Sequence, residues 1–179
     1  MTIMHSINRL LHTVLWCLPP LLGVSSSFAQ ATDTVISVSA VIKESSCKVA
    51  ASSIEQSVDL GKGRVADLKQ ANAATEWKPF SVELTDCPDS VTQVVATVSG
   101  TPDKDRAEDF LNTGTAKKVA VEVKNAADDA QISNGKTVTT TVDQAHNAAL
   151  QFKGRMITPT GGATSGSVVA LMEFSFEFK

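Results

Sequence analysis

The stretch SVVALMEFSFEFK, residues 167–179, alternates apolar and polar side chains toward its C-terminal end. The apolar set takes every second position and consists of Val168, Ala170, Met172, Phe174, Phe176 and Phe178. From Met172 onward, the residue that follows each apolar residue is polar: Glu173, Ser175, Glu177 and Lys179. Because successive side chains of a β-strand point to opposite faces, this spacing predicts a strand with one continuous apolar ridge. Such a ridge must be buried, yet only one residue follows it, so we expect a surface that lacks its covering strand.

A second alternating segment lies ahead of Cys47. Its apolar or small side chains also take every second position, at Thr34, Ile36, Val38, Ala40 and Ile42. One end of the chain is therefore expected to lack a covering strand, while the other end has a strand to spare. This combination indicates a protein whose function is to link.

Residues 1–31 have the pattern of an export signal. A positively charged start precedes an apolar run over residues 10–24, and small residues follow. The triplet from Ala29 to Ala31 fits the small-x-small cleavage rule, which predicts a mature chain that starts at Thr32. Cleavage after Ala29 is the alternative. The apolar run is too short to span a membrane, which argues against an anchor.

The exported part, residues 32–179, has the size of one domain and contains no internal repeat or linker. The full sequence carries a formal net charge of −3 at pH 7 and has no cluster of basic residues. This charge balance argues against nucleic acid or anionic lipid as a partner.

Two cysteines, Cys47 and Cys87, remain after Cys17 leaves with the signal. In an oxidising compartment, a lone pair is most simply one disulfide. In the chain-entropy model, closing a loop of this length stabilises the fold by about 4 kcal/mol. The alternative is two separate buried thiols.

Short alternating runs, separated by glycine, proline, asparagine and aspartate, predict an all-β chain. Besides the N-terminal run, the expected strands are 54–60, 79–85, 91–100, 117–124, 137–143, 149–157 and 168–178. Residues 66–76 are rich in alanine and are expected to form a loop or short turn at one end. About seven short strands with one disulfide favour an immunoglobulin-like sandwich.

Several motifs in this order resemble the pilin subunits of chaperone–usher fimbriae, the type 1 pilus family. The resemblance spans residues 32–179 and includes Cys47, the segments 58–61 (VDLG), 80–88 (FSVELTDCP), 98–101 (VSGT), 112–116 (NTGTA) and 161–166 (GGATSG), and Phe178. Phe178 takes the penultimate aromatic place, where tyrosine is usual in the family. The pattern is most similar to the minor adaptor subunits of fimbrial tips.

The resemblance implies an immunoglobulin-like sandwich that lacks its last strand and is completed by a donor strand. Residues 43–179 would form this pilin domain, and residues 32–42 would be the donor-strand extension. The donor residues that enter a neighbour's groove would be Thr34, Ile36, Val38 and Ala40. The acceptor groove of the chain itself would be lined by Met172, Phe174, Phe176 and Phe178. One departure is Ala40, because the family usually has glycine seven residues before the first cysteine.

The resemblance also implies the partners. A periplasmic chaperone would supply the missing strand first, and at the outer-membrane usher the extension of a neighbouring pilin would replace it. The protein would thus pass through the periplasm into a fimbrium on the bacterial surface. A major rod pilin is the first alternative, and a carbohydrate-binding fimbrial adhesin is the second. Adhesins of this system carry an extra lectin domain and lack a donor extension, which disfavours the second.

The sequence offers little for catalysis or metal binding. His146 is the one histidine outside the signal, and no nucleophile motif lies near it. With the two cysteines paired, one histidine cannot form a zinc site. The acidic pairs at Asp103/Asp105 and Asp128/Asp129 lack the spacing of a calcium loop. We therefore expect no enzyme, no metal, no cofactor and no small-molecule substrate.

Overall fold

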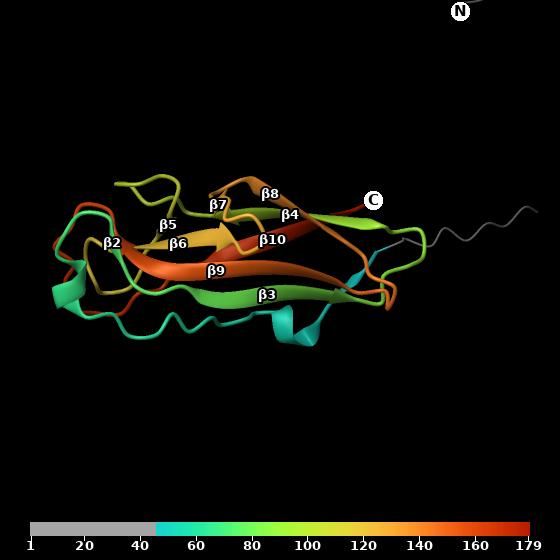
Figure 1. Ribbon diagram of the computed structural model, residues 1–179, viewed down its shortest axis with the longest axis horizontal. Helices are drawn as coiled ribbons and strands as arrows, with labels where there is room; N and C mark the ends of the chain where they lie inside the picture. Colours follow the sequence, from blue (N-terminus) through green and yellow to red (C-terminus); the bar gives the residue numbers. More distant parts are fainter. Residues whose placement is uncertain (1–45) are drawn as a thin grey trace, which may run out of the picture. The chain divides into compact units, whose positions relative to one another are not determined.

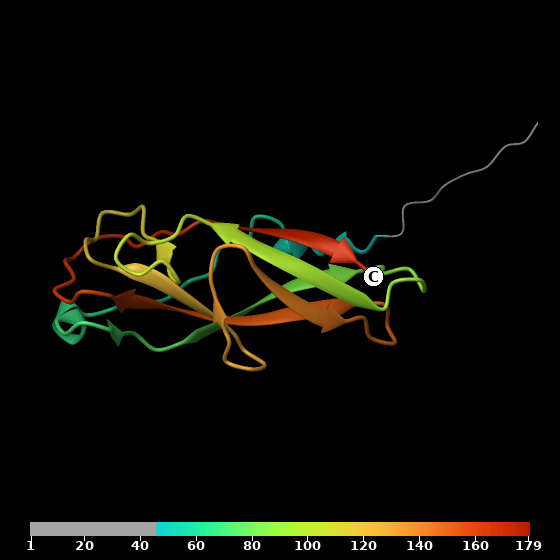
Figure 2. The same ribbon diagram turned by 90° about the horizontal axis from the view of Figure 1, so that it is seen from above.

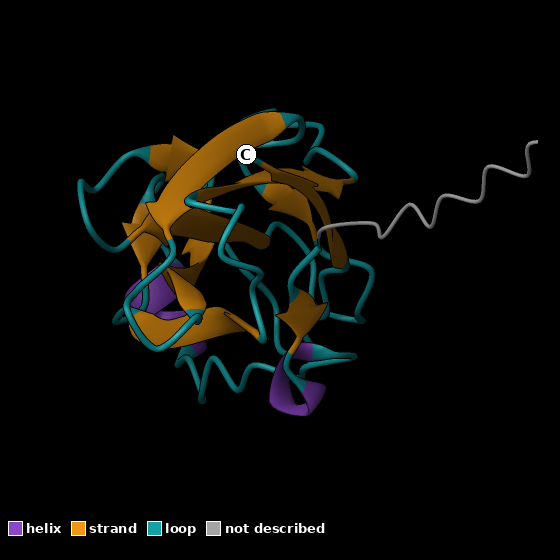
Figure 3. Cartoon of the chain, turned by 90° about the vertical axis from the view of Figure 1, so that its right-hand side faces the viewer, coloured by secondary structure: helices purple, strands orange, loops and turns teal. Residues whose placement is uncertain are grey.

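The computed structural model describes residues 46–179, so the predicted signal (1–31) and extension (32–42) lie outside the described residues. Within this range the chain consists of strands and loops with two short 3-10 helices, η1 (Ala51–Ser53) and η2 (Val65–Leu68) (Figure 3). None of its helices has the length and apolar character needed to cross a membrane.

The strands form two antiparallel sheets (Figures 1 and 2). The larger sheet has the order β1-β3-β9-β6-β5, with β2 paired to β9 and β7 paired to β6. Its strands are β1 (Lys48–Val49), β2 (Ala73–Ala74), β3 (Lys78–Thr85), β5 (Phe110–Leu111), β6 (Ala120–Asn125), β7 (Gln131–Ile132) and β9 (Ala148–Thr158). The smaller sheet has the order β10-β4-β8. Its strands are β4 (Gln93–Gly100), β8 (Lys136–Thr141) and β10 (Met172–Phe178).

The hydrophobic core combines side chains from both sheets. Val94, Ala96 and Val98 of β4 are fully buried. Leu84 of β3 and Phe152 of β9 are also buried, with at most 1% of their surface exposed. These residues follow the period of two that the sequence shows, because a strand with one buried face must alternate. The predicted all-β sandwich is confirmed.

The expected strand over residues 54–60 is wrong. The chain instead forms β1 and η1 just before this range, and residues 54–60 are irregular. Glu55 has a φ of 53°, which lies in the left-handed region that an extended strand cannot use. Ile54 is 59% exposed, so the local alternation of apolar residues does not lead to burial.

The other expected strands are present, with ends that differ by a few residues. The largest shift concerns 168–178, where β10 begins only at Met172. The strand expected over 117–124 begins at Ala120, because Lys118 has a φ of 59°. The range 66–76 contains most of η2 and the short β2, as expected for a short turn. The two-residue strands were not expected, because so short a segment carries no periodicity.

A buried carboxylate, Asp109, directly precedes β5. The side chain of Asp109 is fully buried, and its Oδ1 accepts a hydrogen bond from the Gln131 amide at 3.3 Å. Its Oδ2 lies 3.5 Å from Nε of Arg106 but has no hydrogen-bond partner among the described residues. Burial raises the pKa of Asp109 to about 7, because desolvation penalises the charged form more than Arg106 stabilises it, and Glu122 adds repulsion.

We expect Asp109→Asn to remove a pH dependence of stability. Between about pH 7 and pH 4 the unfolded carboxyl is ionised while the folded one is protonated, so lowering the pH through this window stabilises the wild type. The amide stays neutral throughout. Urea unfolding at pH 8 should therefore show the variant to be more stable than the wild type, and this difference should shrink toward pH 4.

The matched control is the exposed Asp105→Asn, for which no such change is expected. A stability difference between wild type and Asp109→Asn that stays constant from pH 4 to pH 8 would contradict the assignment.

Candidate functional site

One edge of β10 is free within the described residues. On its other side, β10 pairs with β4 over its whole length, from Met172 opposite Gly100 to Phe178 opposite Val94. No described strand pairs with the second edge, so β10 ends the smaller sheet (Figures 1 and 2). An edge of this kind exposes a row of backbone donors and acceptors to which another strand can bind.

The hydrogen-bond pattern identifies which backbone groups are free. Lys179 and Gln93 exchange two backbone hydrogen bonds of 2.9 Å each, so they form a hydrogen-bonded pair of the antiparallel ladder. Such pairs alternate along the ladder, so the backbone groups of Glu173, Ser175 and Glu177 point toward β4. The N–H and C=O groups that point to the free edge are those of Met172, Phe174, Phe176 and Phe178.

The same four residues carry the apolar ridge, and their side chains are only half-buried. They pack against the core from its margin, and the ring of Phe174 lies 5.4 Å from that of Phe152. On the neighbouring β4, the side chains that face the same way are fully buried. The structure thus brings together all four predicted acceptor residues along one strand at the margin of the core. We call these four residues the acceptor row.

A loop after β5 holds the segment that leads into β10. The side chain of Asn112 accepts hydrogen bonds from the N–H groups of Gly114 and Val169, at 2.8 Å each. Its amide also donates to the carbonyl of Ala116 at 2.9 Å. One side chain thereby fixes its own loop and ties it to the segment before β10. We call this arrangement the Asn112 clamp.

Backbone contacts extend the clamp. Thr113 N–H donates to the Val169 carbonyl at 2.8 Å, and Ala116 N–H donates to the Ser167 carbonyl at 3.0 Å. A Cβ atom at Gly114 would collide with the Ser167 carbonyl, so only glycine allows this approach. These bonds take residues 167–169 away from β4, which is why β10 begins later than its sequence pattern predicts.

The motif at residues 112–116 gave no signal for this role from sequence. Its asparagine and glycine indicate a turn, but its contacts lie more than fifty residues further along the chain. The clamp was therefore missed, although the motif itself contributed to the family resemblance.

We expect Asn112→Ala to lower the free energy of unfolding by roughly 1.5–4.5 kcal/mol, because it removes three hydrogen bonds. Asn112→Asp keeps both acceptor bonds but places a carboxylate oxygen against the Ala116 carbonyl in place of the amide donor, so it should also lower the free energy of unfolding. Urea unfolding measures both values. Hydrogen exchange at the Val169 amide should accelerate in Asn112→Ala and stay slow in Asn112→Asp. Equal exchange rates at the Val169 amide in the two variants would contradict the clamp.

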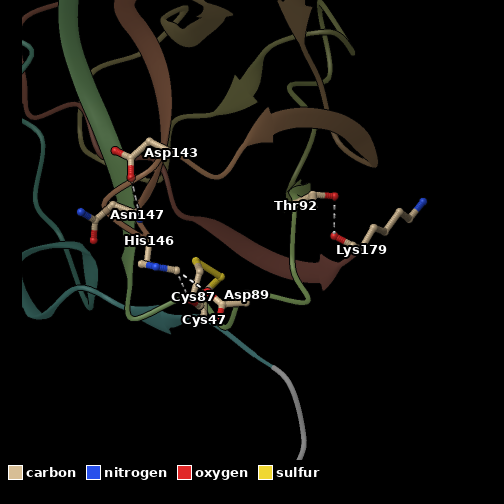
Figure 4. The surroundings of a disulfide bond; sticks show 8 residues. All are labelled: Cys47, Cys87, Asp89, Thr92, Asp143, His146, Asn147 and Lys179. Atoms are coloured by element: carbon tan, nitrogen blue, oxygen red, sulfur yellow. Dashed lines mark hydrogen bonds and ion pairs between the residues drawn. A yellow bond between two sulfur atoms is a disulfide. The ribbon is translucent and has the colours of Figure 1, made fainter.

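The predicted disulfide is present in the structure and joins Cys47 to Cys87 (Figure 4). It ties the segment that leads into β1 to the loop that follows β3. His146 lies beside this loop and contacts the backbone of Cys87 twice. The Cys87 N–H donates to the His146 carbonyl, and Nδ1 of the His146 ring lies 3.0 Å from the Cys87 carbonyl. His146 is exposed and acts as a loop residue, with Asp89 3.5 Å away.

At the far end of β10, the Lys179 carbonyl accepts from the N–H of Thr92 as well as from Gln93, and Figure 4 shows the Thr92 hydroxyl close to it. The C-terminal end of β10 is therefore held by the start of β4, as its N-terminal end is held by the Asn112 clamp.

The described residues contain no group of three or more His, Cys, Asp or Glu side chains that could hold a metal ion. A cavity of about 350 Å³ lies along β8, away from β10. Its lining consists of Asn125, Asp128, Ala130, Ile132, Lys136, Thr137, Val138 and Thr139. This lining has one carboxylate and one ammonium group but neither histidine nor cysteine.

The predicted donor residues Thr34, Ile36, Val38 and Ala40 lie outside the described residues. Their role stays a prediction.

A family model described as fimbrial protein matches residues 36–179. The chain belongs to the fimbrial protein family. The protein FimG of Escherichia coli K12 is 30% identical over 169 residues, which cover 91% of this chain and 98% of that protein. The A chain of the type-1 fimbrial protein of Escherichia coli is 28% identical over 171 residues, which cover 88% and 92%. The resemblance predicted from sequence motifs is thereby confirmed.

Solved structures show the same fold. The P pilus rod subunit PapA superposes with a TM-score of 0.63 at 17% identity, covering 74% of this chain and 99% of that one. A subunit of a chaperone–usher pilus gives a TM-score of 0.63 at 16% identity, covering 86% and 99%. These likenesses confirm the immunoglobulin-like pilin sandwich, and with the sequence relatives they make this protein a structural fimbrial subunit.

Proposed function

We propose that this fimbrial subunit is a minor adaptor that joins its neighbours by strand addition, without catalysis. A neighbour's extended segment would pair with the free edge of β10, and the extension at residues 32–42 would pair in turn with another subunit. The observation that carries this proposal is the coincidence of free backbone groups and half-buried apolar side chains on the same four residues of β10.

The energies support strand addition at this edge. Each large apolar side chain that becomes fully buried contributes roughly 1.5–3 kcal/mol. Each new ladder hydrogen bond contributes roughly 0.5–1.5 kcal/mol net. Because side-chain and backbone groups share the period of two, one strand in the right register satisfies both needs along the whole acceptor row.

The proposed partners follow from the half-buried apolar side chains and the free edge of β10. An uncovered apolar row beside an open edge favours aggregation, so the subunit would travel through the periplasm bound to a chaperone that lends a strand. An outer-membrane usher would then exchange this strand for a neighbouring pilin's extension, and the product would be a fimbrium on the cell surface. A major rod pilin is the second candidate, supported by the relatedness to the type-1 A chain.

Phe178→Ala should weaken capture by the chaperone, because Phe178 ends the acceptor row next to the C-terminus. Because Phe178 is already half-buried against its own core, the loss of contact with the lent strand should be roughly 1 kcal/mol. The measurements are the periplasmic level of the subunit and the amount that co-purifies with the chaperone. Ile54→Ala removes an exposed apolar side chain elsewhere and should leave both unchanged. An unchanged chaperone complex with Phe178→Ala would contradict a docking role for this end of β10.

A synthetic peptide of residues 32–42 tests the donor role directly. Mixed with a chaperone-bound neighbouring subunit, it should displace the chaperone and form an SDS-resistant complex. The double change Ile36→Asp and Val38→Asp should prevent this, because it buries two carboxylates without partners. Its matched control is Ser37→Asp with Ser39→Asp, which adds the same charge to the opposite face of the strand. Equal complex formation by both double variants would show that the alternating apolar face is not the donor.

A further inference from the structure

The solvent face of β10 carries a second row of side chains beside the free edge. Its members alternate with the acceptor row and are all exposed; Glu173, Ser175 and Glu177 belong to β10, and Leu171 lies one residue before the strand begins. We call them the outer row. Leu171 is 75% exposed, the largest exposed fraction among the large hydrophobic side chains of the described residues. The strand-addition argument uses the acceptor row and leaves the outer row without a role.

The residues of β4 that lie opposite the two glutamates of the outer row are uncharged. Glu173 and Glu177 lie opposite Ser99 and Val95 of β4, and Val95 lies opposite Thr139 of β8. The nearest cation is Lys179, whose Nζ lies 3.5 Å from Glu177 at the exposed end of the strand. Among the described residues, Glu177 is therefore paired with Lys179 and Glu173 has no ion-pair partner, which leaves this face with a net negative charge and an apolar residue at its start.

We propose that the outer row selects the incoming strand by its solvent-facing side chains and prefers basic residues opposite Glu173 and Glu177 and an apolar residue opposite Leu171. This inference rests on the proposed function. Side chains directly opposite each other on one face of an antiparallel pair have Cβ atoms only about 4.5–5.5 Å apart, where opposite charges attract and like charges repel.

The spacing gives the partner a recognisable pattern. Every strand pairing in this fold is antiparallel, so we take the incoming strand to be antiparallel to β10. Read from its N-terminus, it then carries a basic residue opposite Glu177, a second one four positions later opposite Glu173, and an apolar residue two positions after that opposite Leu171.

The extension of this chain does not fit that pattern. Between its donor residues, the alternate positions hold Asp33, Val35, Ser37, Ser39 and Val41, none of which is basic. A second copy of the chain would therefore fill the acceptor row without matching the outer row. The preferred partner is a different subunit whose extension carries the two cations, which agrees with a linking role between unlike neighbours.

The size of the preference is set by surface electrostatics. An exposed pair of opposite charges changes an equilibrium by about two- to fivefold, and salt reduces this effect. Two pairs should together favour a matched strand over a like-charged one by about tenfold at low salt. Binding itself comes from the acceptor row and should persist in either case.

The experiment is a competition between two peptides for the full subunit in its chaperone complex. Both peptides keep the donor residues of 32–42; one carries Val35→Lys with Ser39→Lys and the other Val35→Glu with Ser39→Glu. The spacing of these positions matches Glu177 and Glu173, and Val41 then lies opposite Leu171. Mass spectrometry of the SDS-resistant complex gives the ratio of the two peptides, at low and at high salt.

We expect the lysine peptide to dominate by about tenfold on the wild type at low salt and by less at high salt. The preference should disappear with Glu173→Gln and Glu177→Gln and reverse with Glu173→Lys and Glu177→Lys. The control is Asp105→Lys with Asp128→Lys, which changes the net charge by the same amount away from β10 and should keep the wild-type ratio.

The apolar position is tested in the same way. On the wild type, the lysine peptide should outcompete its Val41→Ser version, and Leu171→Ser should remove this difference. If both charged peptides bind and their ratio is the same on all variants, the selection by the outer row is wrong while strand addition stands. If neither peptide forms a complex with the wild type, pairing of the donor residues of 32–42 with β10 is wrong, and the inference fails with it.

Discussion

The structure depends on one constraint, which is that β10 can satisfy only one of its two edges within the described chain. The backbone groups of its odd-numbered residues bond to β4, while those of the acceptor row point outward. Because side chains and backbone groups alternate with the same period, the residues with free N–H and C=O groups are also those whose apolar side chains need cover. A single added strand could satisfy the free backbone groups and cover the apolar side chains at the same time.

Hydrogen bonds from other parts of the fold fix both ends of β10. The Asn112 clamp secures the segment before β10, and the bonds from Thr92 and Gln93 to Lys179 secure its end. An edge held at both ends loses little conformational freedom when a strand binds, so more of the contact energy remains as affinity. The disulfide between Cys47 and Cys87 fastens the start of β1 to the larger sheet in a comparable way.

In the proposed mechanism, the two faces of β10 would contribute separately to recognition of the incoming strand. The acceptor row buries apolar area and would provide most of the affinity for any strand with suitable alternation. The outer row of Leu171, Glu173, Ser175 and Glu177 remains in water, where charges add little affinity but distinguish one strand from another. A subunit that must meet particular neighbours among related ones benefits from this separation.

The sequence by itself determined the features that depend on local alternation or on residue chemistry. These are the apolar ridge that ends at Phe178, the all-β sandwich, the cysteine pair and the family resemblance, while the donor role of residues 32–42 stays a prediction. The tertiary structure decided what depends on distant partners. The alternation at 54–60 did not become a strand, because Glu55 turns the chain and Ile54 finds no core to cover it. The start of β10 and the role of Asn112 follow from hydrogen bonds between segments more than fifty residues apart. Periodicity is a property of one segment, whereas the choice of which edge is paired, clamped or free belongs to the whole fold.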